Sequence, residues 1–420
     1  MAQFQTNSYR EILSNKNFRA FWSGFTISSV GDSQTRVALT WLVFEETHSA
    51  QALGLLTIAY TAPILVGGLI AGPLLDRFSP RRVMLTDNLI RGLIFSLIPI
   101  LHFLNRLELW HIYLFAAIYG FLMMISLAGG PTLIPNIVKE DQLDTANAME
   151  MLSYTVSGVL GPPLAGLLIA WLGATNVVIF DALSYFIFVF ALLGMSVKEA
   201  EPSTDEQAST SYGIMDAVHL MMNNKVILST TLMFMAANVG MGAMTVFLPL
   251  VSNQIAENSS QVFGALLGTM ALGEVISASL AGSLSISIPL GKRIALAQIL
   301  SGLSLFFLLM GSVFWLVAIG LFLLGFFSAP LTIWAQTLRM QVIPPELRGR
   351  TFALLRTLMQ GATPLGGALA GLLLPLWGIQ VIVGLSVVVI GIPGLVGLQV
   401  KELVLASKDT SGVLVVDNTN

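Results

Sequence analysis

Long apolar stretches separated by short polar segments fill almost the whole chain of 420 residues. About 20 consecutive apolar residues form a helix that crosses the hydrocarbon core of a bilayer. The pattern therefore predicts an all-α membrane protein with twelve spanning helices, at residues 18–44, 51–75, 83–104, 110–136, 146–171, 175–197, 222–252, 262–288, 293–311, 313–338, 350–377 and 379–400.

Composition agrees with this pattern and excludes several classes of function. Hydrophobic residues make up 55% of the chain and charged residues only 10%, against about 25% in an ordinary soluble domain. A net charge of −3 gives no indication of a nucleic-acid partner, and the absence of cysteine excludes disulfides and thiolate metal sites. Walker loops, metal-spaced His pairs and serine elbows are also missing, so we expect neither enzymatic activity nor a cofactor.

The Lys and Arg residues predict the orientation in the membrane. Nearly all 20 of them fall at the termini or in loops after even-numbered spans, whereas the opposite loops hold only Arg106. Basic loops stay on the cytoplasmic side, so we expect both termini there, in a bacterial inner (plasma) membrane. Residues 1–17 are polar and show no cleavable signal peptide.

The chain reads as a duplicated unit. Residues 160–168 of the fifth span match residues 365–373 of the eleventh at an offset of 205, and Ala71-Gly72 resembles Ala281-Gly282. Two related six-helix halves predict a central pathway between them. The expected organisation is an N-terminal bundle (1–197), a cytoplasmic linker (198–218), a C-terminal bundle (219–400) and a cytoplasmic tail (401–420).

Three motifs resemble those of the major facilitator superfamily. Residues 72–82, Gly-Pro-Leu-Leu-Asp-Arg-Phe-Ser-Pro-Arg-Arg, are similar to its loop motif Gly-x-Leu-Ala-Asp-Arg-x-Gly-Arg-Arg. Asn17-Phe18-Arg19, Gly31-Asp32 and residues 38–43 resemble the drug-efflux branch that holds macrolide exporters and the enterobactin exporter. Residues 161–166 are similar to the Gly-Pro-x-x-Gly-Gly antiporter motif, with Ala165 in place of the first paired glycine. The resemblance implies two pseudo-symmetric six-helix bundles.

The resemblance also implies two conformational devices. The loop is expected to act as a latch in which Asp76 faces a helix N-terminus of the other half when the cytoplasmic side is closed; its alternative role is a basic anchor. Small residues and proline in the fifth span suit an antiporter-type hinge facing Gly264 and Gly268, or plain packing. The latch residues are Gly72, Asp76, Arg77, Arg81 and Arg82, and the hinge residues are Gly158, Gly161, Pro162 and Gly166.

Ionisable residues inside spans are candidates for function because a charge is costly there. In the first span Ser29, Asp32, Arg36 and Thr40 share one helix face. We expect Asp32 to bind a proton or a cationic group beside a wet cavity, or to pair structurally with Arg36. Glu274 has no basic neighbour within a turn, so it is a second proton-coupling candidate, or a neutral hydrogen-bonded carboxyl.

Other polar residues, together with methionines and a tryptophan, complete the candidate site. Arg356 and Gln360 form a shorter polar stripe, and the cavity contacts are expected to include Asn238, Met123, Met241 and Trp334, unless these pack or face lipid. The remaining buried charges are interpreted as structural or interfacial: the pair Asp87 and Arg91 near the cytoplasmic end, and Glu150 and Asp181.

The sequence thus predicts a secondary active exporter of an amphipathic or lipophilic small molecule, which is drug-, macrolide- or siderophore-like. Proton antiport with alternating access is expected, because no nucleotide site is present and an ion gradient must supply the energy. The alternatives are a lipid or lysolipid flippase, an uncoupled facilitator, or a non-transporting membrane receptor. The expected partners are lipid, the solute and a proton, with the chain acting as a monomer.

Overall fold

The computed structural model describes residues 9–196, 214–257, 259–281, 288–310, 313–344 and 347–406. The described elements are helical throughout, with two short 3-10 turns, Ile134–Asn136 and Glu140–Gln142. Most of the expected linker and tail, residues 198–213 and 407–420, lies outside the described residues. The helices are α2 (Lys16–Thr47), α3 (Ala50–Arg77), α4 (Pro80–Phe103), α5 (Leu109–Leu133), α6 (Leu143–Leu172), α7 (Ala174–Leu193), α8 (Ile214–Asn223), α9 (Lys225–Ile255), α10 (Ser260–Ala281), α11 (Leu290–Ser304), α12 (Phe306–Leu309), α13 (Phe314–Val342), α14 (Arg348–Gly397) and α15 (Lys401–Val404).

Twelve helical arms cross the membrane. Ten helices of the described chain are long and apolar enough to span a bilayer. One of them, within α14, runs for 44 residues and breaks at Gly378 (φ 79°), so it supplies two arms. The twelfth is α2, which has 32 residues but carries Asp32 and Arg36 in its apolar stretch. The predicted fold class is confirmed.

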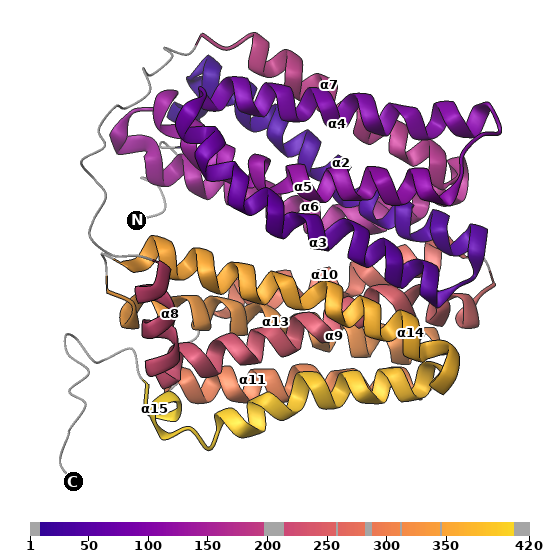
Figure 1. Ribbon diagram of the computed structural model, residues 1–420, viewed down its shortest axis with the longest axis vertical. Helices are drawn as coiled ribbons and strands as arrows, with labels where there is room; N and C mark the ends of the chain where they lie inside the picture. Colours follow the sequence, from indigo (N-terminus) through magenta and orange to yellow (C-terminus); the bar gives the residue numbers. More distant parts are fainter. Residues whose placement is uncertain are drawn as a thin grey trace.

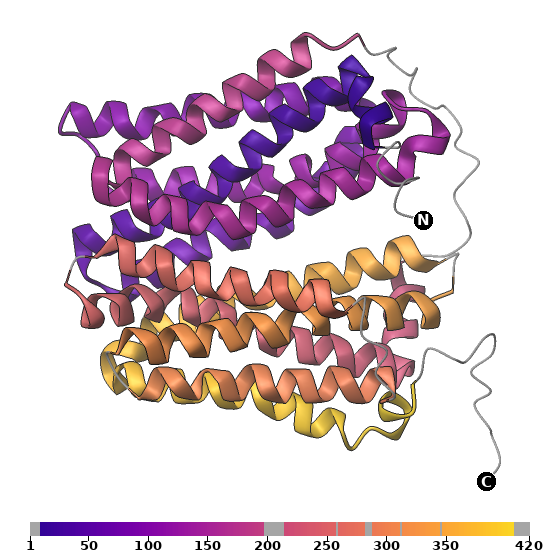
Figure 2. The same ribbon diagram turned by 180° about the vertical axis from the view of Figure 1, so that it is seen from behind.

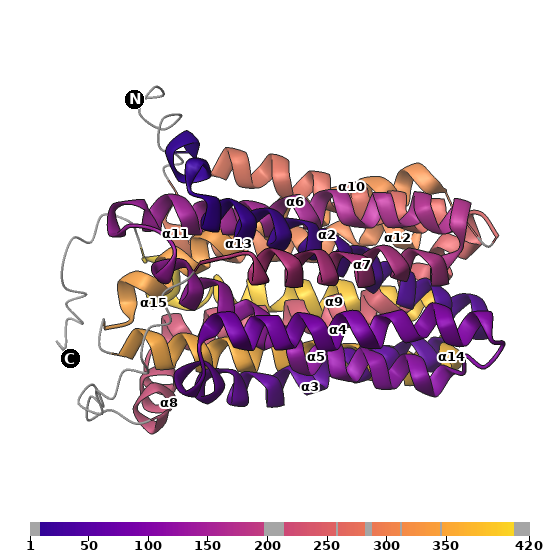
Figure 3. The ribbon, with the colours of Figure 1, turned by 90° about the horizontal axis from the view of Figure 1, so that it is seen from above.

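The arms form two bundles, stacked one above the other in Figure 1. Helices α2 to α7 make the N-terminal half, where α2 packs on α6 and α7, and α3 packs on α5. Helices α9 to α14 make the C-terminal half, where α9 packs on α14, and α13 on α10 and α11. Figure 2 shows the same two layers from behind, and Figure 3 shows them from above. We call the side of the molecule on which α2 begins and α15 lies the terminal side, and the opposite one the far side (Figure 1).

Equivalent contacts inside the two halves show the duplication in three dimensions. Gly120 of α5 packs against the Tyr60 carbonyl of α3, and Gly325 of α13 packs against the Met270 carbonyl of α10. These residues are related by offsets of 205 for α5 to α13 and 210 for α3 to α10. The halves are therefore pseudo-symmetric copies, and residues can be compared position by position.

The halves touch along two seams near their far-side ends. In one seam a Cβ on Gly54 would lie 3.0 Å from the Gly371 Cα atom, and in the other a Cβ on Gly166 would lie 2.7 Å from the Gly264 Cα atom. Only residues without side-chain bulk allow such close helix approach. The two seams are equivalents, because the same offsets relate them.

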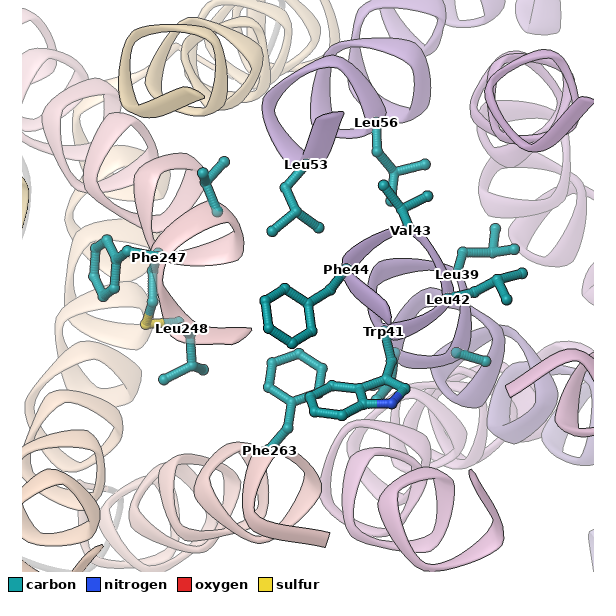
Figure 4. Close-up of a cluster of buried hydrophobic side chains, with 14 of the residues drawn as sticks. Leu39, Trp41, Leu42, Val43, Phe44, Leu53, Leu56, Phe247, Leu248 and Phe263 are labelled. Carbon is teal, nitrogen blue, oxygen red and sulfur yellow. The ribbon is translucent and has the colours of Figure 1, made fainter. Parts of the chain in front are cut away.

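An apolar plug of buried side chains fills the space between the halves beside these seams (Figure 4). Trp41 of α2 stacks on Phe263 of α10, with ring centroids 5.7 Å apart. Thr57 and Thr245 share a hydrogen bond of 2.9 Å across the same junction. Toward the terminal side the ribbons of the two halves diverge (Figures 1 and 2). The structure is thus closed on its far side.

Candidate functional site

A cavity of about 350 Å³ lies at the junction of the halves, next to the far-side plug. Helices α2 and α6 supply one wall, and α9 and α10 supply the other. The polar lining consists of Ser33, Arg36, Thr40, Thr245 and Glu274. The apolar lining includes Met241, Met244, Leu248, Phe263, Leu267 and Met270. A pocket of soft, aromatic and aliphatic side chains with a few polar groups is typical of sites for organic ligands.

Two opposite charges face this cavity, one from each half. Arg36 projects from the middle of α2 and is exposed to the cavity, while Glu274 lies half-buried on α10. Arg36 is in electrostatic contact with the hydroxyl group of Tyr60 on α3, which holds the guanidinium against the N-terminal wall. Arg36 and Glu274 thus belong to different halves of the molecule.

Asp32 sits one turn before Arg36, in an ionic chain that runs into the N-terminal half. The Arg91 guanidinium lies 3.7 Å from the Asp32 carboxylate and 3.1 Å from the Asp87 carboxylate. The side chain of Asp32 is 28% exposed, whereas those of Arg91 and Asp87 are each 1% exposed. Asp32 is therefore the solvent-exposed end of an otherwise buried network, and its ion-pair partner is Arg91.

Aromatic and hydroxyl groups complete the network. The Tyr185 hydroxyl donates a hydrogen bond to Asp32, and the Ser126 hydroxyl donates to Asp87 at 2.6 Å. The Arg91 guanidinium also lies over the Tyr119 ring, 4.9 Å from its centroid. Four helices of the N-terminal half, α2, α4, α5 and α7, contribute members of this network.

Two acids that were expected at the membrane interface are buried between helices. Asp181 is fully buried on α7, where the Ser184 hydroxyl donates to its carboxylate at 3.2 Å and Gly31 of α2 packs directly against it. Glu150 is 5% exposed on α6 and packs against Gly130 of α5. The absence of a side chain at each glycine makes room for a carboxyl group between helices. Asp87 and Arg91 form the expected pair, and Arg91 joins this pair to Asp32.

The other predicted contacts fall in different places. Met241 lines the cavity, but the Asn238 amide donates to the Met359 carbonyl at 2.8 Å inside the C-terminal half. The Met123 sulfur accepts a bond from the Tyr60 hydroxyl at 3.6 Å, which places it behind the wall. Ser29 is 7% exposed. Trp334 lies in a separate groove, beneath the Arg293 guanidinium.

The polar stripe of the eleventh span faces the gap between the halves on the terminal side. Arg356 and Gln360 are both exposed. Arg356 lies within electrostatic reach of Tyr154 on α6 of the opposite half. Neither residue is part of the cavity lining, whereas Arg36 and Glu274 are.

The hinge residues divide between the cavity and the seam. Gly158 and Pro162 line the cavity, and Gly161 packs against Ser33 of α2. Gly166 meets Gly264, and the expected contact of the fifth span with Gly264 and Gly268 is confirmed. Helix α6 runs without a break through both of its prolines.

The basic loop is described in part. Arg81 donates to the carbonyls of Leu192 and Leu193 at 2.8 and 2.9 Å, which ties the start of α4 to the end of α7. Arg77 lies at the exposed end of α3, and Arg82 lines a lateral groove. The side chain of Asp76, and the surroundings of Gly72, lie outside the described residues.

Sequence reasoning missed the hydroxyl groups of Tyr185 and Ser126 and the ring of Tyr119, which come from two other helices, α7 and α5. No spacing along the chain connects them to Asp32. The one available signal was the i,i+4 spacing of Asp87 and Arg91, which marks a pair but leaves its third partner open. Among the described residues no group of three or more His, Asp or Glu side chains is placed to hold a metal ion.

Comparisons with known proteins agree with this geometry. A family described as "Transmembrane secretion effector" matches residues 8–414. The staphyloferrin A transporter of Staphylococcus aureus is 23% identical over 367 residues, covering 86% of this chain and 90% of that protein. The multidrug efflux pump Tap of Mycolicibacterium fortuitum is 24% identical, covering 91% of this chain and 95% of that protein.

Two further similarities extend over most of the chain. The enterobactin exporter EntS of Escherichia coli O1:K1 is 25% identical, with 84% of each chain covered. The crystal structure of the nucleoside transporter NupG superposes with a TM-score of 0.69 at 12% identity, covering 91% of this chain and 98% of that one. At that identity the structural likeness establishes the fold alone.

Proposed function

Because the chain belongs to the transmembrane secretion effector family of the major facilitator superfamily, we propose that it exports an amphipathic small molecule in exchange for protons. The chain is a multi-pass membrane transporter of this superfamily, and the resemblance stated from its motifs is confirmed. The direction of transport, the coupling ion and the class of solute are what we propose.

The observation that carries the proposal is the cavity between the halves, with Arg36 on one wall and Glu274 on the other. A site at the interface of two repeats is what alternating access needs, because rocking of the halves exposes it to one side and then the other. Its Met, Phe and Leu lining suits a solute with a substantial apolar surface. Drugs and siderophores, the cargo in the names of the relatives, fit this description.

The transport cycle follows from the seams. We place the terminal side in the cytoplasm, so that the described state receives solute from inside. Separation of the Gly54–Gly371 and Gly166–Gly264 contacts opens the far side, and the basic loop with Asp76 then latches the cytoplasmic side. Protons that enter from outside bind Asp32 and Glu274, and their release inside resets the carrier.

The two acids have different tasks in this scheme. Glu274 stands alone on its wall, so its protonation removes the negative charge opposite Arg36. Asp32 already pairs with Arg91 and accepts a hydrogen bond from the Tyr185 hydroxyl. Protonation of Asp32 removes its ion pair with Arg91, so Asp87 becomes the remaining ionic partner of Arg91. The first change acts on the solute, and the second acts on the packing of the N-terminal half.

The decisive experiment is transport by purified protein in liposomes with an imposed pH gradient. A fluorescent amphipathic cation and a catecholate-type siderophore serve as two probe solutes. We expect uphill movement of at least one probe, accompanied by proton flux of opposite direction and abolished by a protonophore. Equilibration without uphill movement would identify an uncoupled facilitator, and no movement of any probe by folded protein would favour the receptor alternative.

A further inference from the structure

Two lateral grooves on the lipid-facing flanks of the molecule are outside the proposed transport path. The first, of about 650 Å³, lies between α3, α4 and α5 and has Arg82 in its lining. The second, of about 240 Å³, lies between α10, α11 and α13 and has Arg293 in its lining. Neither groove shares a lining residue with the central cavity; Ser277 of the second groove lies three residues after Glu274, which lines the cavity from the same helix.

The grooves are equivalents in the duplicated fold. Ile70, Phe78 and Ile90 of the first correspond to Leu280, Ile288 and Leu300 of the second at an offset of 210. At the offset of 205, Phe121, Leu122 and Ile125 correspond to Phe326, Phe327 and Pro330. The arginines differ by one position, since the strict equivalent of Arg82 is Lys292. Both copies thus keep an apolar groove with a basic residue at the same end.

The shape and placement of each groove match one lipid chain. Arg82 and Ile90 are eight residues apart on α4, which corresponds to about 12 Å along a helix. Half of a hydrocarbon core is about 15 Å thick, so the groove reaches from the terminal-side interface to the middle of the bilayer. The outer residues of the two grooves are exposed, for example Phe78 of the first (50%) and Leu300 of the second (40%).

We propose that each groove binds an anionic phospholipid of the terminal-side leaflet, with one acyl chain in the groove and the phosphate group at the arginine. Charge complementarity selects this occupant, because the apolar walls accept any chain whereas the arginine at the interface favours a negative headgroup. A basic residue near a membrane surface contributes about 1 kcal/mol toward an anionic lipid. The inference needs only that the chain spans a bilayer, so it stands apart from proton coupling and from the identity of the solute.

Lipid in the first groove would contact the ionic network. Asp87 lies at the groove floor and is also the buried partner of Arg91. Its equivalent in the second groove is Ala297. The first groove therefore links lipid occupancy to the Asp32 network, while the second binds lipid without such a link.

Trp334 provides a built-in probe of the second groove, because brominated acyl chains quench tryptophan by contact. The protein is reconstituted with brominated phosphatidylglycerol or brominated phosphatidylcholine, and Trp334→Phe is measured alongside so that the difference isolates Trp334. We expect phosphatidylglycerol to be preferred roughly fivefold at this residue. Arg293→Gln should bring the preference close to one, and Arg293→Lys should keep most of it.

Trp315 is a matched control on the same helix. It is 72% exposed at the far end of α13 and lines neither groove. The difference between the parent and Trp315→Phe should show no preference between the two lipids. Equal quenching of Trp334 by both lipids, or a preference that survives Arg293→Gln, would overturn the proposal. Shielding of Trp334 from both lipids would overturn it too, because a second copy or bound solute would then cover the groove.

Discussion

The two halves share a scaffold but differ in their charges. Gly92 and Asn88 of α4 have close equivalents in Gly302 and Gln298 of α11, so the backbone and much of the packing are duplicated. The ionic network around Asp32 is not duplicated in the C-terminal half. Asp32 corresponds to Met241 at the offset of 209 that relates Val30-Gly31 to Val239-Gly240, and Asp87 and Arg91 correspond to Ala297 and Ser301 at the offset of 210. At the offset of 205, their partners Tyr119, Ser126, Asp181 and Tyr185 correspond to Leu324, Leu331, Ser386 and Ile390.

This comparison shows that the fold does not need the network. Burying charges costs free energy that their mutual attraction often fails to recover, and apolar replacement of a whole cluster is frequently neutral. The C-terminal half folds with the uncharged equivalents, and the described parts of its spanning helices carry one acid, Glu274, whose equivalent in the N-terminal half is Ile64. The N-terminal half therefore holds the Asp32 network, which the C-terminal half lacks, and the C-terminal half holds Glu274, which the N-terminal half lacks. This difference points to two separate roles in transport.

The largest effect is expected when the N-terminal network is replaced by its C-terminal equivalents. The triple variant Asp32→Met, Asp87→Ala and Arg91→Ser should fold, because all three charges leave together. Proton-driven transport should fall to background in the liposome assay, since the N-terminal half has lost Asp32 and can no longer respond to protons, although Glu274 remains. Asn88→Gln is the control, because it also replaces a residue of α4 by its C-terminal equivalent, Gln298, and it should transport normally. Full activity of the triple variant would remove the network from the mechanism.

The second largest effect is on stability, and it tests whether the buried pair of Asp87 and Arg91 is needed for folding. Arg91→Ser alone leaves Asp87 buried and unpaired, so we expect a loss of about 3–5 kcal/mol in the free energy of unfolding. The double variant Asp87→Ala, Arg91→Ser removes both partners and should recover most of that loss. Reversible unfolding in mixed detergent measures both. A double variant as unstable as the single one would show that the buried pair is structurally indispensable.

The sequence predicted the fold well because lipid imposes a simple rule on length and polarity. Twelve spans, the kinked hairpin at Gly378 and the two halves all follow from apolar runs and from the repeated glycines. The site was predicted in outline, since Arg36, Met241 and Glu274 do line the cavity. What remained hidden were contacts between helices: the bond from Tyr185 to Asp32, the burial of Asp181 behind Gly31, and the position of Trp334 outside the cavity.

A third effect tests the acid that belongs to the C-terminal half. One proton crossing 100 mV supplies about 2.3 kcal/mol, which corresponds to roughly a 50-fold concentration ratio. Glu274→Gln should lower uphill accumulation by up to this factor while downhill exchange of solute continues, because the cavity keeps its shape. Ser277→Ala, one turn along α10, is the matched control. If Glu274→Gln accumulates solute as the parent does, coupling resides in the N-terminal half alone.

The smallest effect concerns the seams, where the halves are alike. A methyl group at Gly166 would press on the Gly264 backbone, whereas one at Gly158 on the same helix would meet no heavy atom within 4 Å. Overpacking of this kind costs about 1–3 kcal/mol, and here it penalises only the state closed on the far side. Gly166→Ala should therefore raise labelling of a cavity cysteine from the far side by about tenfold, and Gly158→Ala should leave it unchanged.

Thr40→Cys supplies that reporter, because the chain has no other cysteine and Thr40 lines the cavity. A membrane-impermeant maleimide added to whole cells reaches it only when the far side opens, if the termini are cytoplasmic as proposed. The pseudo-symmetric change Gly54→Ala should act in the same direction, since Gly54 approaches the Gly371 backbone in the sister seam. Should Gly166→Ala and Gly54→Ala both label like Gly158→Ala, the seams would be passive packing, and the switch between states would have to lie elsewhere in the molecule.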